Sequence, residues 1–201
     1  MRFVLASASP ARLNVLRNAG IEPVVRVSGV DEDAVAAALS DPTPGELVTA
    51  LARAKAEVIA ADEEDALVVG CDSMLLTADG EVQGKPGTVE NARARWRKMA
   101  GTTGTLLTGH AILKVENGQV TDSVADHEAT HVRFGTPTED ELEAYLATGE
   151  PLQVAGAFTL DGLGGWFVDG IDGDPSSVIG ISLPLTRKLL RRLDVVISDI
   201  W

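Results

Sequence analysis

Cysteine, basic residues and long apolar runs are all scarce in this sequence. A single cysteine excludes an internal disulfide framework. No apolar run approaches the roughly 20 residues that a membrane-spanning helix requires. The first residues also lack the basic, then apolar, then small pattern of a secretory signal. These absences together lead us to expect a cytoplasmic protein.

The shortage of positively charged residues bears most directly on which ligands the protein can bind. The chain has 17 lysines and arginines against 30 aspartates and glutamates, for a net charge of −13. Proteins bind nucleic acid polymers chiefly through Lys and Arg contacts with phosphates, so this balance argues against such a partner. A small anionic ligand would require the few basic residues to gather around it. Their positions in the sequence are therefore informative.

Periodicity predicts the fold class. The 201 residues, 45% of them hydrophobic, can bury the core of one domain over 1–201, with two lobes as a variant of that domain. Continuous apolar runs at 3–5 and 67–70 are typical of buried strands, and the strand pattern over 106–134 turns at Asn117-Gly118, a strong hairpin signal. Helices and strands do not alternate strictly, so we predict an α/β fold with a mixed sheet.

Helix beginnings are marked clearly. Thr43 with Glu46, and Thr138 with Glu141, have the spacing of capping boxes, in which each side chain bonds the other residue's backbone. The first box precedes an apolar stripe at helical spacing over 47–59. Further helices are predicted at about 88–100, with its basic residues mostly solvated, and at 185–193.

The start of the chain combines a strand end, hydroxyl groups and a helix beginning. The run 3–5 is followed by Ser7 and Ser9, and Pro10 then opens a helix-like segment. Serine suits the cap and proline the first helical position, whose φ it already adopts. The free N–H groups, the two hydroxyls and the guanidinium of Arg12 would form an anion-binding site. We therefore predict a phosphate-sized ligand here, which favours nucleotide chemistry.

Three further residues are candidates for chemistry, each with a simpler explanation. Asp72 follows the run 67–70 and is predicted at a strand end, where ligands gather in α/β sheets; it is a candidate base or metal ligand, or the start of a turn. Lys85 lies between Gly84 and Pro86, and Lys55 has small neighbours on its helix that would let a ligand approach. For both lysines, simple solvent exposure is the alternative.

The segment His127-Glu128-Ala129-Thr130-His131 matches the zinc-protease motif letter for letter. That motif works only on a helix, where residues four apart share a face. Here the segment follows the hairpin turn and continues as a strand, in which histidines four apart are about 13 Å from each other. We therefore reject the zinc interpretation.

Two more candidates are rejected. Asp169, Asp172 and Asp174 resemble a calcium loop, but the twelfth position from Asp169 is Gly180, where an EF-hand requires glutamate. Cys71 ends an apolar run with no base near it in sequence. It is therefore expected to be a small core residue and not a nucleophile.

Taken together, the motifs resemble the Maf family of nucleoside triphosphate pyrophosphatases. The resemblance covers essentially the whole chain, in the segments 5–12, 70–73, 84–86, 149–152, 155–158, 162–165 and 180–185. It implies hydrolysis of a nucleoside triphosphate, including modified or non-standard ones, to the monophosphate and pyrophosphate. It further implies a mixed, twisted sheet flanked by helices around a central nucleotide-binding cleft, and a divalent metal, Mg²⁺ or Mn²⁺. A homodimer and a link to inhibition of septum formation also follow from it.

The resemblance assigns the catalytic roles. Asp72 becomes the proton acceptor that activates a water for attack on the α-phosphorus, and also a metal neighbour. Glu32, within the acidic triplet 31–33, matches the family's second acidic position and is assigned to the metal. A helix start, where acids favour the helix dipole, is the alternative for this triplet.

The binding roles follow in the same way. The hydroxyl and basic residues divide between the triphosphate as a whole and the leaving pyrophosphate. Ser7, Ser9 and Arg12 would grip the triphosphate, whereas Lys55 and Lys85 would offset charge on the pyrophosphate.

Base preference stays open because three positions disagree. Members that prefer dTTP and UTP have arginine at the position of Ala11, and members that act on 7-methyl-GTP tend to have tryptophan there. Ser73 leans toward the first group, which has threonine. Asp161 leans toward the second, which has glutamate. An ionised acid can only accept hydrogen bonds, so Asp161 would favour a donor edge such as that of guanine.

Two alternatives to this activity remain, besides the metalloprotease rejected above. A nucleotide-binding regulator of cell division would use the same anion site without catalysis, although such a protein has no need of a base at Asp72. A phosphatase would release orthophosphate instead of pyrophosphate. A metalloprotease would need His127 and His131 on a helix.

Overall fold

The computed structural model describes residues 1–201, which divide into two units. Unit 1 comprises residues 1–72, 108–128 and 180–201, and unit 2 comprises residues 73–107 and 129–179. The strands are β1 (Arg2–Leu5), β2 (Val24–Val25), β3 (Ala66–Leu76), β4 (Val82–Gln83), β5 (Thr103–Glu116), β6 (Gln119–Phe134) and β7 (Val168–Asp172). The α-helices are α1 (Pro10–Asn18), α2 (Glu32–Ala37), α3 (Pro44–Ala60), α4 (Val89–Met99), α5 (Glu139–Ala147), α6 (Pro175–Ile179) and α7 (Leu183–Arg192). Short 3₁₀ turns are η1 (Glu150–Gln153), η2 (Ala155–Ala157), η3 (Leu163–Phe167) and η4 (Ile197–Asp199).

The sheet is mixed, as the sequence predicts. In unit 1 the strand order is β2-β1-β3-β5-β6, and β1 runs parallel to both β2 and β3. In unit 2, β4 pairs antiparallel with β3, and β7 pairs antiparallel with β6. The α/β fold class with a mixed sheet and flanking helices is therefore confirmed. The central cleft implied by the resemblance and the single domain over residues 1–201 stay predictions.

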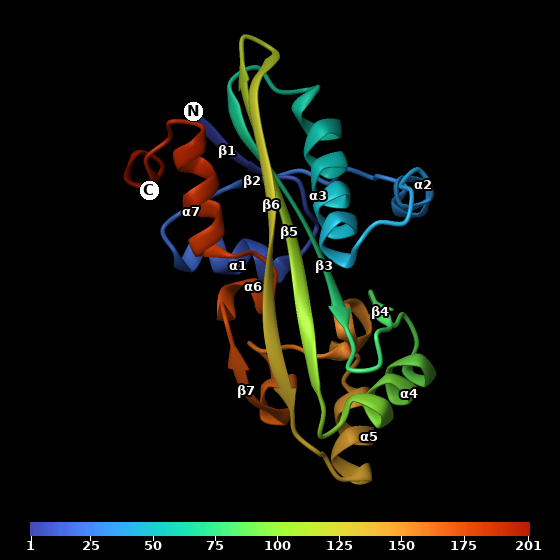
Figure 1. Cartoon of the computed structure of the whole chain (residues 1–201). Coiled ribbons are helices and arrows are strands. Elements are labelled where there is room, and N and C mark those ends of the chain that lie inside the picture. Colours follow the sequence, from blue (N-terminus) through green and yellow to red (C-terminus); the bar gives the residue numbers. More distant parts are fainter. The chain divides into compact units, whose positions relative to one another are not determined.

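Alternating residues of the strands in unit 1 face two different helical layers. Leu5 and Val69 belong to one apolar cluster, which also contains residues of α1 and α7. Val4 and Val68, each one position earlier, belong to a second cluster with the small residues of α3. This is the period of two expected when both faces of a strand are covered. Figure 1 shows α3 and α7 on opposite sides of these strands.

Glycine allows α3 to lie unusually close to the sheet. A Cβ atom at Gly70 on β3 would be 2.0 Å from the carbonyl oxygen of Ala52, and one at Gly109 on β5 would be 2.2 Å from that of Val48. Any side chain at these positions would push the helix outward. This close approach brings side chains of α3 within reach of β3.

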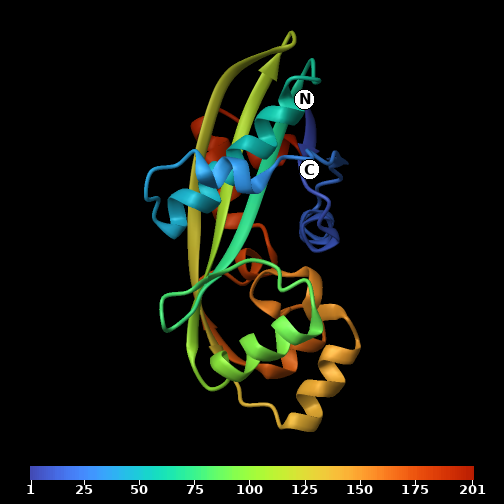
Figure 2. The ribbon, with the colours of Figure 1, turned by 90° about the vertical axis from the view of Figure 1, so that its right-hand side faces the viewer.

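The core of unit 2 forms around Trp96 on α4. Its indole ring makes edge-to-face contacts with Phe134 and Tyr145, and its N–H donates to the carbonyl oxygen of Ala157 at 2.7 Å. Buried indole rings usually find such a partner, because an unpaired N–H would be costly. Helices α4 and α5 lie side by side around this core (Figure 2).

Local predictions from the sequence are largely confirmed. Ser9 caps α1, and both capping boxes form at the starts of α3 and α5. The hairpin joins β5 to β6 at Asn117-Gly118, and helices α4 and α7 lie where the periodicity predicts them. None of the helices has the length and apolar character needed to span a bilayer.

One boundary is wrong. Asp72 was predicted at the end of a strand, but β3 continues past it to Leu76. The reason is a long-range pairing: Leu75 and Leu76 are hydrogen-bonded to the short strand β4. Asp72 is therefore held by extended backbone on both sides and does not start a turn.

Candidate active site

The predicted anion-binding residues at the start of α1 contact one another. Arg12 donates from Nη1 to Ser7 Oγ at 2.9 Å, and Ser7 Oγ also accepts from the backbone N–H of Ser9 at 3.2 Å. Ser9 Oγ in turn accepts from the backbone N–H of Arg12 at 3.4 Å. We call Ser7, Ser9 and Arg12 the Ser7–Arg12 cluster. It brings two hydroxyl groups, a helix N-terminus and a guanidinium together, which is a combination suited to phosphate oxygens.

A second contact fixes the guanidinium of Arg12 from the far end of the sequence. Its Nε donates to the carbonyl oxygen of Gly180 at 2.8 Å. Gly180 has a φ of +139°, and a Cβ there would lie 3.1 Å from Arg12 Cγ. The position thus suits glycine both by its backbone conformation and by the space available. Acceptors in two segments far apart in the sequence therefore orient the Arg12 group.

Lys55 on α3 lies between two carboxylates. Its Nζ is 2.5 Å from Asp72 Oδ1 and 2.6 Å from Glu32 Oε1. The Lys55 side chain is only 12% exposed, whereas that of Glu32 is 54% exposed. The small residues around Lys55 permit this arrangement, because they and Gly70 bring α3 close to β3. The sequence-based alternative of a simply solvated lysine is therefore wrong for Lys55.

Asp72 is the more deeply buried of the two acids that contact Lys55. The residue is 6% exposed, and its Oδ2 atom is buried without a hydrogen-bond partner. Burial raises the pKa of its carboxyl group above the ordinary aspartate value, and the nearby Lys55 and Arg12 charges oppose that shift. A buried carboxylate with one oxygen unengaged can accept a proton or ligate a metal.

Glu32 lies at a helix start, which is the alternative given for the acidic triplet, and its assignment to a metal stays a prediction. It is the first residue of α2, and Asp31 caps that helix by accepting from the backbone N–H of Ala34 at 3.0 Å. Glu32 also shares the Lys55 ammonium with Asp72, so the two carboxylates converge. The chain holds no group of three or more His, Cys, Asp or Glu residues arranged to bind a metal.

Lys85, in unit 2, is exposed on a loop whose backbone is firmly anchored. The carbonyl oxygen of Gly84 accepts from Arg95 Nη1 at 2.6 Å and from the backbone N–H of Gly156 at 3.2 Å. On the other side, the carbonyl oxygen of Pro86 accepts from Asn91 Nδ2 at 3.0 Å. Arg95 was predicted to belong to a solvated face of α4, and this is wrong: it is half-buried, and burial lowers its pKa.

The three positions considered for base preference lie on different elements. Ala11 is partly buried in α1, Ser73 is partly buried in β3, and Asp161 is exposed. The loop that carries Asp161 surrounds the Glu150 carboxylate. That group accepts hydrogen bonds from the Thr159 hydroxyl and from the backbone N–H of Gly164, the latter at 3.0 Å.

The rejected motifs lie where the sequence predicts. His127 and His131 are both within strand β6, so the helix that the zinc-protease motif requires is absent. Cys71 is fully buried among apolar residues, and burial raises the pKa of its thiol to about 11. A thiol with so high a pKa is almost wholly protonated near neutral pH and is a poor nucleophile.

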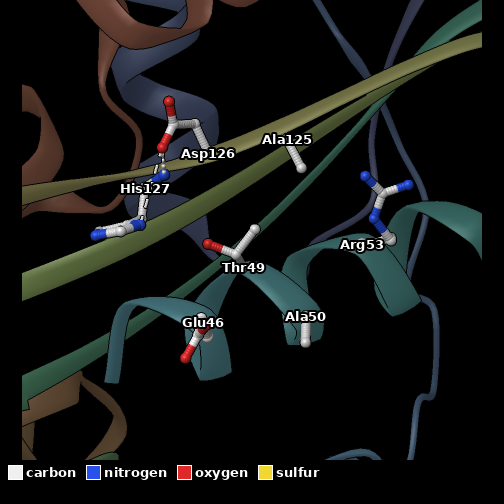
Figure 3. Close-up of a pocket in the computed structure, with 7 residues that line it drawn as sticks. All are labelled: Glu46, Thr49, Ala50, Arg53, Ala125, Asp126 and His127. Carbon is white, nitrogen blue, oxygen red and sulfur yellow. Dashed lines mark hydrogen bonds and ion pairs between the residues drawn. The ribbon is translucent and has the colours of Figure 1, made fainter. Parts of the chain in front are cut away.

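A surface groove in unit 1 lies apart from these residues. It has a volume of about 370 Å³ and separates α3 from β6 (Figure 3). His127 covers the start of α3 there, because a Cβ at Gly45 would be 2.5 Å from its Nε2. The groove contains none of the predicted site residues; it is lined by Glu46, Thr49, Ala50, Arg53, Ala125, Asp126 and His127.

Sequence reasoning missed His110 and the segment 180–182 as parts of this neighbourhood. His110 is fully buried on β5, and its ring accepts from the backbone N–H of Ser182. A histidine within a long apolar strand was the available signal. Its partner lies 72 positions away, which local patterns do not reveal.

Comparison with known proteins gives a consistent result. A family model described as Maf-like protein matches residues 2–193. A curated relative from Saccharopolyspora erythraea is 66% identical over 100% of this chain and 97% of its own length. Relatives from Rhodococcus jostii (65% identical; 99% and 95% covered) and Mycolicibacterium gilvum (58% identical; 100% and 98% covered) are similar throughout. All three are named nucleoside triphosphate pyrophosphatase.

Proposed function

Because this chain belongs to the Maf-like family, we propose that it hydrolyses nucleoside triphosphates to the monophosphate and pyrophosphate. The observation that carries the proposal is the combination within unit 1 of a phosphate-binding arrangement and a buried acid. Arg12 Nη1 donates to Ser7 Oγ, and Asp72 has an unpartnered buried oxygen beside Lys55. The same activity is named for full-length relatives at 58–66% identity.

In this proposal the Ser7–Arg12 cluster binds the triphosphate. The substrate carries several negative charges, and the chain as a whole has a net charge of −13. A guanidinium held by Ser7 and Gly180 is oriented before the ligand arrives. Less side-chain freedom is then lost on binding than for a mobile arginine.

Asp72 acts as the general base. A water oxygen attacks the α-phosphorus while its proton passes to the Asp72 carboxylate, and the bond between the α-phosphorus and the bridging oxygen breaks. The electron pair of that bond leaves with pyrophosphate. Lys55 holds Asp72 Oδ1, so Oδ2 remains for the water. The raised pKa of Asp72 makes it a better proton acceptor than an exposed aspartate.

Glu32 and Asp72 are the residues that would hold a divalent cation such as Mg²⁺ or Mn²⁺. They fit that group because their carboxylates converge beside a cation, the Lys55 ammonium, and the Glu32 carboxylate is about half exposed. Two protein carboxylates with substrate phosphates form a usual magnesium environment, so the lack of a third acidic ligand is not an obstacle. When bound, the cation would supply Lewis-acid stabilisation of charge on the phosphate oxygens.

Two residues of unit 2 complete the proposal. Lys85 would neutralise charge on the leaving pyrophosphate, as its motif between Gly84 and Pro86 suggests. Asp161 would read the base, favouring one with N–H donors because its carboxylate can only accept. Support for both comes from the family motifs and from the anchoring of their loops.

The proposal is tested by product analysis with magnesium or manganese. The substrates are dTTP, UTP, CTP, GTP and 7-methyl-GTP, and pyrophosphate is scored separately from orthophosphate. We expect pyrophosphate and monophosphate from at least one substrate, and loss of turnover by a factor of at least about 10³ in Asp72→Asn, in line with removal of a general base.

Two outcomes would contradict the proposal. Release of orthophosphate alone would identify a phosphatase. Nucleotide binding without any turnover would favour a non-catalytic regulator of cell division. Asp126→Asn is a suitable control, because Asp126 is an exposed acid of the same unit that lines the separate groove.

A further inference from the structure

His110 is a buried histidine that the proposed reaction does not use. Its hydrogen bonds define which ring nitrogen carries the proton. Its Nδ1 lies 3.0 Å from the carbonyl oxygen of Thr108, which can only accept. Its Nε2 lies 2.8 Å from the backbone N–H of Ser182, which can only donate. The ring must therefore be neutral, with its proton on Nδ1 and the lone pair of Nε2 facing Ser182.

The Ser182 backbone is the link between this histidine and the Ser7–Arg12 cluster. Ser182 caps α7, since its Oγ accepts from the backbone N–H of Leu185 at 3.0 Å. Two residues earlier, the carbonyl oxygen of Gly180 accepts from Arg12 Nε. The short segment 180–182 is thus fixed at Ser182 by the histidine ring and at Gly180 by the arginine it orients.

We propose that His110 is a positioning residue for Arg12, acting through the backbone segment 180–182. This inference rests on the proposed function, in which Arg12 grips the triphosphate. If Nε2 no longer accepts from Ser182, a buried N–H loses its partner and the segment must shift to find another. The Gly180 carbonyl then moves with it, and the Arg12 guanidinium loses an acceptor that orients it.

Two substitutions distinguish the hydrogen bonds made by the two ring nitrogens. Gln carries its terminal amide atoms at the distance of Nε2 from the backbone, so His110→Gln can still accept from Ser182. Asn carries them at the distance of Nδ1, so His110→Asn can still donate to Thr108 but leaves Ser182 unpaired. The two substitutions are matched in polarity. They differ mainly in whether the new side chain can accept from the backbone N–H of Ser182, which is the hydrogen bond that the inference requires.

The experiment measures binding of inorganic triphosphate in magnesium buffer by calorimetry, with each substitution in the wild-type and Arg12→Ala backgrounds. This probe needs no assumption about the base. We expect His110→Asn to weaken binding about tenfold in the wild-type background and His110→Gln to restore most of it. In the Arg12→Ala background neither should have an effect, because the two changes act through the same group.

The outcomes separate this inference from the function it rests on. If Arg12→Ala binds triphosphate normally, the proposed role of the cluster is wrong. If Arg12→Ala weakens binding while His110→Asn is silent, or costs the same factor in both backgrounds, His110 does not position Arg12. Equal losses in His110→Gln and His110→Asn would also contradict the inference.

A second variant covers the case in which Asn at this buried position prevents folding. Gly180→Ala alters the other end of the segment, where the new Cβ would lie 3.1 Å from Arg12 Cγ. It should also weaken triphosphate binding, and again only when Arg12 is present. Nitrogen-15 NMR of the wild-type histidine ring should report the Nδ1–H tautomer, and the Nε2–H tautomer would overturn the inference without any variant.

Discussion

At the scale of single residues, Asp72 combines a proposed catalytic role with a cost to folding. It is buried, one of its oxygens lacks a partner, and its pKa is raised mainly because burial penalises the charged form. Functional acids commonly have this character, because a raised pKa suits proton transfer but disfavours the charged native state.

This predicts a pH-dependent gain of stability in Asp72→Asn. Below the ordinary aspartate pKa the carboxyl is protonated in both folded and unfolded protein and contributes nothing. As the pH rises through that value toward the raised native pKa, the native state binds more protons than the unfolded state, so the free energy of unfolding of the wild type falls. Above the native pKa the deficit is constant. Relative to the wild type, the variant should therefore gain stability across this acidic window.

Urea unfolding at a series of acidic to neutral pH values measures this difference. Glu46→Gln is the control, for which we expect the change in stability with pH to have the opposite sign. Hydrogen bonds from Thr43 lower the pKa of Glu46, so its stabilising contribution is present above the ordinary glutamate pKa and is lost as the pH falls through the lowered one. A wild-type advantage over Asp72→Asn that grows with pH would show that burial does not dominate the energetics of Asp72.

At the scale of elements, α4 holds the loop that carries Lys85. Arg95 and Asn91 on α4 donate to the carbonyl oxygens on either side of that lysine. Lys85 itself is exposed, so its position depends on this anchored backbone.

Arg95→Met should therefore weaken substrate use. Methionine keeps much of the apolar stem of Arg95 and removes the donor to the Gly84 carbonyl oxygen. If Lys85 binds the pyrophosphate portion of the substrate, we expect KM to rise about three- to tenfold, in proportion to one hydrogen bond, with a smaller change in kcat. Steady-state kinetics on the preferred nucleotide provide the measurement.

Arg97→Met is the matched control for this prediction. Arg97 lies on the same helix, is exposed and pairs with Glu139 on α5. Exposed ion pairs contribute little, so its loss should leave both kinetic constants nearly unchanged. Equal effects of the two substitutions would mean that Arg95 does not act through the Lys85 loop.

The elements also show what a sequence can predict. Ser9, Thr43 and Thr138 cap helices where expected, because a cap depends on residues only three positions away. The continuation of β3 beyond Asp72 was missed, since it depends on pairing with β4, which no local pattern encodes. For the same reason the sequence placed Arg12 and Gly180 in separate motifs but did not show that the Gly180 carbonyl, 168 positions later, is an acceptor for Arg12.

At the scale of the whole molecule, two of the 17 basic residues of an acidic chain lie beside the buried Asp72, where an anionic substrate is proposed to bind. Arg12 and Lys55 both lie within unit 1 near Asp72, and their charges oppose the rise in its pKa that burial causes. Motif resemblance found these residues without a structure. Their contacts, and the sharing of Lys55 by Glu32 and Asp72, required the folded arrangement.

The most direct test of the central claim is to follow the oxygen of the attacking water. The wild-type protein is supplied with its preferred nucleoside triphosphate in water enriched in oxygen-18, and both products are examined by phosphorus NMR or mass spectrometry. Attack on the α-phosphorus predicts one labelled oxygen in the monophosphate and none in the pyrophosphate. Label in pyrophosphate with none in the monophosphate would place the attack on the β-phosphorus and contradict the account.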